Sequence, residues 1–283
     1  MAPLFHTSRI ADLGHSLWIA LAFVLARGAM NRLTRGGLEA YARSQKVVGV
    51  SVGKLQEEVW LVVCGTALSA FSGLLLARSP SFDGCNLFDT SRCYSNVSSE
   101  EVPRDISTYY LIEVGWYLSL ILKSAVGVGR GDSAVMEFHH VVTLALVIWS
   151  YVTGFTQVIG VLTFFIFNQS NPVLHLSKLT NYMEMRSARA AMFVLFSLVF
   201  FASRIVLLPA VVIRSTWFEM PLAVSPADWA TQVRYTWIAV NALLAALWAL
   251  NVYWLKPIAR VAQRNLSGED EGRPTDDTVT KRA

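Results

Sequence analysis

Long apolar segments set the strongest limit on how this chain can fold. Hydrophobic residues make up 54% of its 283 residues and charged residues only 16%, against about 25% in an ordinary soluble domain. Segments of about 20 apolar residues are long enough to cross a bilayer as helices. The chain is therefore predicted to be an all-α polytopic membrane protein. Its seven apolar segments are 11–28, 58–77, 109–127, 136–153, 157–177, 190–213 and 231–255.

The first segment is the weakest of the seven, because it is short and contains His15. A cleaved signal peptide is the alternative reading, since the basic residue Arg9 precedes it. We favour a retained helix, which forms an N-terminal part, residues 1–49, together with a basic cytosolic link. The membrane domain then covers residues 50–258. The tail, residues 259–283, is polar and charged towards its end and is predicted to be disordered.

The positions of basic residues predict the orientation, because lysine and arginine concentrate in cytosolic loops. Basic residues gather in 28–57, around 128–135, in 178–189 and after 255. Placing these stretches in the cytosol puts the N-terminus in the lumen and the C-terminus in the cytosol. The same distribution accounts for the net charge of +4, so no nucleic-acid partner is predicted.

The loop 78–108 supports this orientation independently. It contains Cys85, Cys93 and an N-x-S glycosylation sequon at Asn96. A disulfide and an N-linked glycan both form on the lumenal, oxidising side. We therefore expect a Cys85–Cys93 bridge and a glycan on Asn96.

Two groups of polar residues lie inside apolar segments, where such residues are costly and often functional. His139 and His140 are adjacent, and Thr143 shares a helix face with His139. In the next segment Asn168, Asn171, His175 and Lys178 are spaced by three, four and three residues, which also places them on one helix face. With the predicted orientation, both groups lie in the cytosolic half of the bilayer. An imidazole there could act as base, acid or nucleophile, although one of two adjacent histidines is often only a structural hydrogen-bond partner.

A further stripe of Tyr110, Glu113 and Tyr117 lies in the segment 109–127. Glu113 is expected to pair with Arg204, and a structural role for that pair is favoured because an intramembrane charge needs a partner in any case. Pro172 is expected to kink its helix and free backbone carbonyl groups beside Asn171.

Several of these stretches resemble motifs of the TLC-domain family, and within it the ceramide synthases. GDSAVMEFHHVVT (131–143) and FNQSNPVLHLSKLTNY (167–182) are similar to the two halves of the family's Lag motif. KLQEEVW (54–60), YYLIEVGWYLS (109–119) and FASRIVLLP (201–209) resemble further family segments. The likeness runs in order from about residue 50 to residue 255.

This resemblance implies a six-helix barrel preceded by one extra helix, in the endoplasmic reticulum membrane. It also implies transfer of a fatty acyl group from acyl-CoA to the amine of a sphingoid base, with no cofactor besides acyl-CoA as co-substrate. The implied partners are these two substrates, the lipid bilayer, and further copies or other ceramide synthases in an oligomer. The expected catalytic residues are His139, His140, Asn168, Asn171 and His175, and the expected substrate-binding residues are Thr143, Lys178, Tyr110, Glu113, Tyr117 and Tyr182.

The chain departs from the family at the two catalytic aspartates, which are Asn168 and Asn171 here. An amide can donate and accept hydrogen bonds, but it cannot hold the charge of an imidazolium. The nearest replacements are Asp132, predicted to lie in a loop outside the barrel, and His175, predicted to face the same way as Asn171. The alternative function is therefore a non-catalytic lipid-binding TLC protein, or a pseudo-enzyme that regulates an active partner. A transporter has less support, since the chain has no inverted repeat, and no metal-binding spacing is present.

Overall fold

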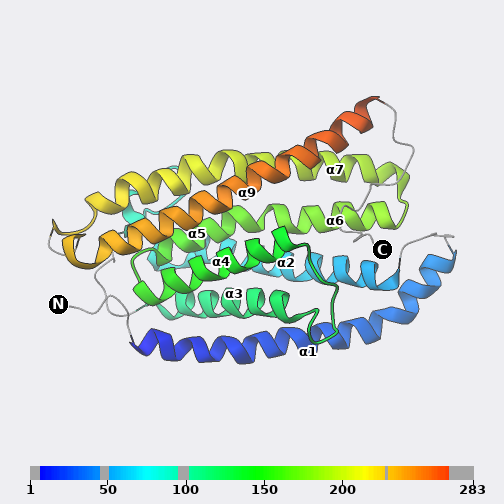
Figure 1. Cartoon of the computed structure of the whole chain (residues 1–283), viewed down its shortest axis with the longest axis horizontal. Helices are drawn as coiled ribbons and strands as arrows, with labels where there is room; N and C mark the ends of the chain where they lie inside the picture. The colour runs from blue at the N-terminus through cyan, green and yellow to red at the C-terminus, as the bar shows by residue number, and fades with distance from the viewer. Residues whose placement is uncertain (1–6, 45–50, 95–101, 227–228, 268–283) are drawn as a thin grey trace.

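The computed structural model describes residues 7–44, 51–94, 102–226 and 229–267, and confirms the predicted all-α membrane fold (Figure 1). These ranges are built from helices and contain no strand. The long helices are α1 (Thr7–Ser44), α2 (Val52–Arg78), α3 (Arg104–Leu122), α4 (Ala134–Thr153), α5 (Gln157–Asn168), α6 (Ser170–Tyr182), α7 (Arg186–Phe200), η3 (Phe201–Ile213) and α9 (Arg234–Ser267). Short helical turns complete the set: η1 (Pro80–Phe82), η2 (Ser91–Tyr94), η4 (Ser215–Glu219), η5 (Met220–Leu222) and η6 (Trp229–Val233).

Six helical rods form a closed ring. In order around it, α2 contacts α3, α3 contacts α4, α4 contacts α9, and α9 contacts the rod made of α7 and η3. That rod contacts the rod made of α5 and α6, which returns to α2. Helix α1 lies outside the ring against α2 and α3 (Figure 1). Gly115 allows this approach, because a Cβ there would lie 2.6 Å from the side chain of Ile19.

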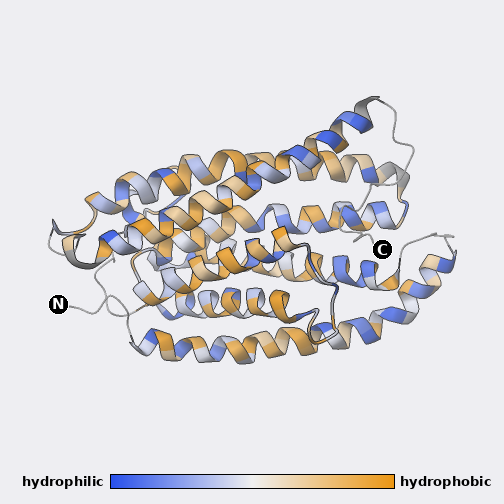
Figure 2. Cartoon of the chain, in the orientation of Figure 1, coloured by the Kyte–Doolittle hydropathy of each residue, from blue (hydrophilic) through white to orange (hydrophobic). Residues whose placement is uncertain are grey.

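The helices have the dimensions and composition of membrane spans. Five of them, in the ranges 7–44, 52–78, 134–153, 188–222 and 234–264, are long and apolar enough to cross a bilayer. Large apolar side chains are exposed on the outer face, among them Trp18, Leu198 and Ile238, as expected of a surface that contacts lipid. Figure 2 shows hydrophobic residues along the middle of the helices and hydrophilic ones towards the end where α1 and α9 finish.

Two helices are longer than their apolar segments predicted. Helix α1 continues past residue 28 to Ser44, where Arg35 and Glu39 form an ion pair one turn apart, 2.8 Å between Nε and Oε1. Helix α9 continues to Ser267, so the prediction of a disordered tail from residue 259 is wrong for 259–267. Hydropathy marks only the part of a helix that lies in lipid, and a polar extension is invisible to it. Residues 268–283 lie outside the described residues.

Proline interrupts the rod formed by α5 and α6, as predicted. Pro172 has no N–H to donate to the carbonyl of Asn168, and the α-helix is broken between Asn168 and Ser170. Near this break the carbonyl of Phe167 accepts from the Ser170 hydroxyl, at 3.2 Å, and from Arg204 of η3. A backbone carbonyl beside the break is thus an acceptor for a side chain of another helix.

The connection between α2 and α3 closes one end of the ring, which we name the disulfide end. Cys85 and Cys93 are joined by a disulfide there, and the Tyr94 hydroxyl lies 3.0 Å from the Ser215 hydroxyl of η4. Asn96 lies outside the described residues. The opposite end, where α4 begins and α1 and α9 finish, is named the histidine end.

Candidate functional site

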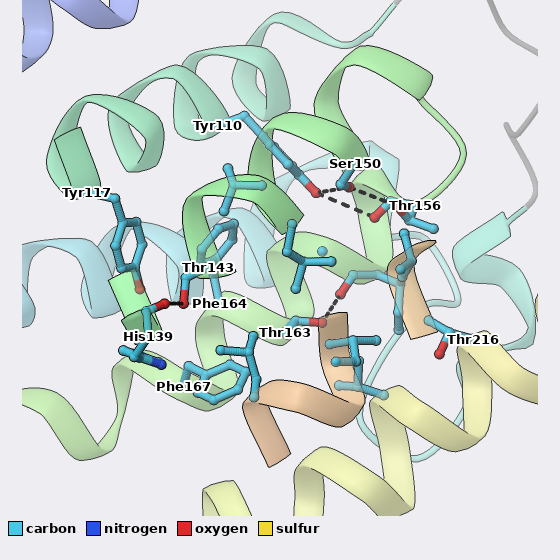
Figure 3. Close-up of a pocket in the computed structure, with 18 of the residues that line it drawn as sticks. Tyr110, Tyr117, His139, Thr143, Ser150, Thr156, Thr163, Phe164, Phe167 and Thr216 are labelled. Atoms are coloured by element: carbon cyan, nitrogen blue, oxygen red, sulfur yellow. Dashed lines mark hydrogen bonds between the residues drawn. The ribbon is translucent and has the colours of Figure 1, made fainter. Parts of the chain in front are cut away.

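A mostly apolar cavity lies within the ring of helices, between α3, α4, α5, η3 and α9. It holds about 600 Å³ of empty space, including the part that opens to the exterior. Figure 3 shows His139 and Tyr117 at one end, and Ser150, Thr156 and Thr216 towards the other. His139 and Ser150 are eleven residues apart on α4, which corresponds to about 16 Å along the helix axis. The cavity is therefore elongated, with His139 and Tyr117 at the histidine end.

His139 is the histidine that lines this cavity. Its ring packs edge-on against Trp254 of α9, with 5.1 Å between ring centroids. Its backbone carbonyl accepts from the Thr143 hydroxyl at 2.8 Å, one helical turn later. Its Nδ1 atom is buried and has no hydrogen-bond partner among the described residues. An imidazole in this state is free to exchange a proton with a bound molecule.

His140 points to a different partner, although it is also buried. Its Nε2 atom lies 3.4 Å from Oδ2 of Asp132, in the connection before α4. Asp132 also binds Lys123, with 3.0 Å between Oδ2 and Nζ. Lys123 in turn lies 2.8 Å from Oε1 of Glu57, whose other oxygen binds Arg27 of α1. His140 is therefore anchored through a chain of ion pairs that links α1, α2 and the connection before α4.

Asp132 is held in its ionised form. Its burial opposes the charge, but the hydrogen bond from His140 and the ammonium of Lys123 outweigh it and lower the pKa of Asp132 to about 2. As the sequence predicted, Asp132 lies in a loop and does not line the cavity within the ring, but its contact with His140 was not predicted. The loop folds back over the start of α4, which Ser133 caps by accepting from the backbone N–H of Met136. Asp132 thus supplies a carboxylate to one histidine of the pair.

Asn168 and Asn171 lie side by side behind the cavity wall and connect two charged residues. Asn168 donates to Oε1 of Glu113 at 3.0 Å and to the Tyr109 hydroxyl at 3.2 Å. Asn171 donates to Oδ1 of Asn168 at 3.4 Å, and its own Oδ1 accepts from Arg204 at 2.6 Å. The predicted direct pair between Glu113 and Arg204 is therefore wrong, because two amides stand between them.

Among the described residues, neither asparagine hydrogen-bonds to a histidine, and neither belongs to the cavity lining. Arg204 does line the cavity, and its guanidinium also donates to Ser170, Asn251 and the carbonyl of Phe167. Asn171 therefore helps to hold Arg204 in position, and Arg204 is the member of this group that lines the cavity.

The remaining predicted site residues separate into two sets. Tyr110, Tyr117 and Thr143 line the cavity; the Tyr110 hydroxyl lies 2.8 Å from that of Ser150 at the far end (Figure 3). His175 does not join them, because its Nδ1 lies 2.6 Å from Oε2 of Glu58 on α2. Lys178 and Tyr182 are also absent from the lining, and Tyr182 has the ammonium of Lys54 over its ring at 5.6 Å.

The sequence interpretation underrated Arg204 and Asp132 and passed over Trp254. A signal was present for Arg204, since it is an arginine inside an apolar segment. No spacing along the chain could have indicated that Trp254 meets His139. Within the described ranges, no three His, Cys, Asp or Glu side chains are grouped so that they could hold a metal ion.

The chain resembles proteins of one family along most of its length. It is 29% identical to ceramide synthase 5 of Homo sapiens over 213 residues, 75% of this chain and 51% of that protein. It is 28% identical to ceramide synthase hyl-1 of Caenorhabditis elegans over 246 residues, 85% of this chain and 63% of that protein. With ASC1-like protein 3 of Oryza sativa subsp. japonica it shares 25% identity over 90% of both chains.

This chain spans about half the length of the curated ceramide synthases that it matches first. The family model of the TLC domain (TRAM_LAG1_CLN8) matches residues 54–260, which include both polar groups and all of the ring except the first residues of α2 and the last of α9. By this match, which covers most of its length, the chain belongs to the TLC-domain family.

Proposed function

We propose that this protein is a sphingoid base N-acyltransferase, a ceramide synthase that uses acyl-CoA. The observation that carries the proposal is the apolar cavity that ends at His139, with Tyr117 and Arg204 beside it. An extended apolar cavity suits a fatty acyl chain, and the polar groups at its end suit the carbonyl carbon at which transfer occurs. The ceramide synthases among the relatives point to the same substrates.

The proposed reaction forms an amide and breaks a thioester. The amine nitrogen of the sphingoid base attacks the carbonyl carbon of the acyl-CoA, and the bond from that carbon to sulfur then breaks. His139 accepts the proton that the amine loses and returns it to the departing sulfur, so that CoA leaves as a thiol. Negative charge that develops on the carbonyl oxygen is stabilised by the guanidinium of Arg204 and the Tyr117 hydroxyl, which line the same end.

In this proposal His140 is a positioning residue. Its contact with Asp132 fixes the start of α4, and hence the place of the neighbouring His139. We further propose that the protein resides in the endoplasmic reticulum membrane with the histidine end facing the cytosol. Acyl-CoA, a cytosolic substrate with a large polar head, would then reach His139 without crossing the bilayer.

The deciding experiment measures N-acylation in membranes that lack other ceramide synthases. The chain is expressed there, and acyl-CoA of several chain lengths is supplied with a long-chain base. N-acylated base should form with the intact chain and disappear with His139→Ala. A chain that makes none at any acyl length, while reaching the membrane in normal amount, would refute the proposal and favour the non-catalytic alternative.

A further inference from the structure

The guanidinium of Arg204 is a buried cation whose protein partners are all neutral. It donates to the Ser170 hydroxyl at 2.7 Å and to the side-chain oxygens of Asn171 at 2.6 Å and Asn251 at 3.4 Å. A fourth hydrogen bond reaches the carbonyl of Phe167 at 3.2 Å. Within the described part of the chain, no carboxylate forms an ion pair with it. Buried charges are normally paired, because removing an isolated charge from water is costly.

The nearest carboxylate along this hydrogen-bonded chain belongs to Glu113. It is separated from Arg204 by the amides of Asn168 and Asn171, and it is bound by Asn168 and Tyr109. Because Asn171 is neutral, it satisfies the geometry of the guanidinium without cancelling its charge. Among the described residues, Arg204 therefore has only neutral groups in direct contact with its charge.

The position of the guanidinium indicates where an anion could bind. Arg204 and His139 line the same end of the cavity, and the guanidinium lies over the ring of Phe167 at 4.9 Å. An arginine has five N–H donors, and the four hydrogen bonds to the protein leave one donor, on Nη1. His139 adds a second polar atom, since its buried Nδ1 has no partner among the described residues. The lining of this apolar cavity thus includes an arginine with one N–H donor left over and a histidine whose Nδ1 has no partner among the described residues.

We propose that this cavity binds a free long-chain fatty acid, with its carboxylate on Arg204 and its chain along the apolar lining. A carboxylate supplies a negative charge to the guanidinium and can accept a charge-assisted hydrogen bond from the remaining N–H donor on Nη1. The alkyl chain gains by leaving water for the apolar walls. The inference concerns a ligand and does not require the transfer reaction. If the protein is also an acyltransferase, free fatty acid competes with acyl-CoA for the same space.

The test is direct binding of palmitic acid to the purified full-length protein in nanodiscs of zwitterionic lipid, without CoA or a long-chain base. Saturable binding is expected for the fatty acid, and at least tenfold weaker binding for the alcohol of the same chain length, which carries no charge. Equal binding of acid and alcohol would overturn the proposal, because it would show that only the apolar chain is recognised.

Two variants test whether the carboxylate of bound palmitate lies on Arg204. Asn171→Asp is nearly isosteric and places a permanent anion beside Arg204, so it should weaken palmitate binding at least tenfold while leaving the melting temperature unchanged or higher. Arg204→Gln should weaken it similarly, and if that variant does not fold, Asn171→Asp alone decides. The matched control is Arg214→Gln, since Arg214 lies outside the cavity lining and pairs with Glu219 near the disulfide end. Undiminished binding by Asn171→Asp would refute the assignment.

The result of the palmitate-binding test can be distinguished from the result of the N-acylation test of the proposed function. Binding is measured without turnover, so an inactive protein that binds palmitate through Arg204 retains this inference. An active acyltransferase that binds acid and alcohol equally loses it.

Discussion

The amide nitrogen of Asn168 donates to Oε1 of Glu113 across 3.0 Å in the interior of the ring. Both side chains are buried: Glu113 has no exposed surface and Asn168 is 3% exposed. The Tyr109 hydroxyl donates to the same oxygen at 2.5 Å. An aspartate at position 168 would instead bring a second carboxylate to within hydrogen-bonding distance of the first. The neutral amide is therefore the side chain that suits a buried glutamate at this place.

We predict that Asn168→Asp destabilises the protein. Two carboxylates at this distance repel each other unless they share a proton, and burial strengthens the repulsion. The expected loss is about 2 kcal/mol or more in the free energy of unfolding, seen as a lower melting temperature in detergent. Adding Glu113→Gln to Asn168→Asp should restore most of the loss, because it removes the second charge. Additive effects of the two substitutions would show that the residues are not coupled.

The two histidines should differ in what their loss does. His139→Ala removes the imidazole that lines the cavity, and we predict a fall of about a hundredfold to ten-thousandfold in the N-acylation rate. His140→Ala should cost about ten- to a hundredfold, because it acts through the placement of α4 and not on the substrate. The measurement is the initial rate at saturating acyl-CoA in the same membranes. Equal effects of the two substitutions would contradict this division of roles.

The ionised state of Asp132 has a pH dependence with a definite sign. Its pKa is lowered from 3.8 to about 2, so its carboxylate stabilises the fold above about pH 4, and that contribution is lost as the pH falls towards 2. We predict that Asp132→Asn lowers the melting temperature by the same amount from pH 8 to pH 5. The difference from the unmodified protein should shrink only below about pH 4. A difference that disappears already between pH 7 and pH 5 would mean that another group controls this contact.

The sequence was enough to predict the helical rods of the ring, because an apolar segment of sufficient length indicates a helix that lies in lipid. It also predicted a site at His139 from the cost of an imidazole at membrane depth, and the structure places His139 in the lining of a cavity. It failed where contacts join different helices. Spacing showed that Asn171 and His175 lie one turn apart, yet Asn171 binds Arg204 on η3 and His175 binds Glu58 on α2. Helical periodicity fixes the face of a residue, but only the packing of the ring decides which helix that face meets.

The same limit applied to Asp132. Its place between two apolar segments correctly predicted a loop, but not the path of that loop. The ion pairs with Lys123 and His140 bring the carboxylate back over α4. These contacts depend on the ends of α3 and α4 being neighbours, which hydropathy does not report.

The far end of the cavity should limit the length of the acyl chain. Val240 of α9 lines the cavity and is 2% exposed. Its neighbour in the chain, Asn241, contacts Thr216 at 2.8 Å, which places this part of α9 away from His139. We predict that Val240→Phe fills this end and shifts the products towards shorter acyl chains, because a long chain loses the space for its last carbons.

Competition between acyl-CoA species of two chain lengths in one assay, with the products separated by mass spectrometry, measures the shift. The ratio of long to short N-acyl products should fall at least fivefold, while the rate with the short acyl-CoA stays within about twofold. The matched control is Ile238→Phe, which makes a similar change two residues away on the same helix, where the side chain is 52% exposed on the outer face. That variant should leave the product ratio unchanged. If both substitutions shift the ratio equally, the effect comes from a change in α9 as a whole. The far end of the cavity would then not limit the length of the acyl chain.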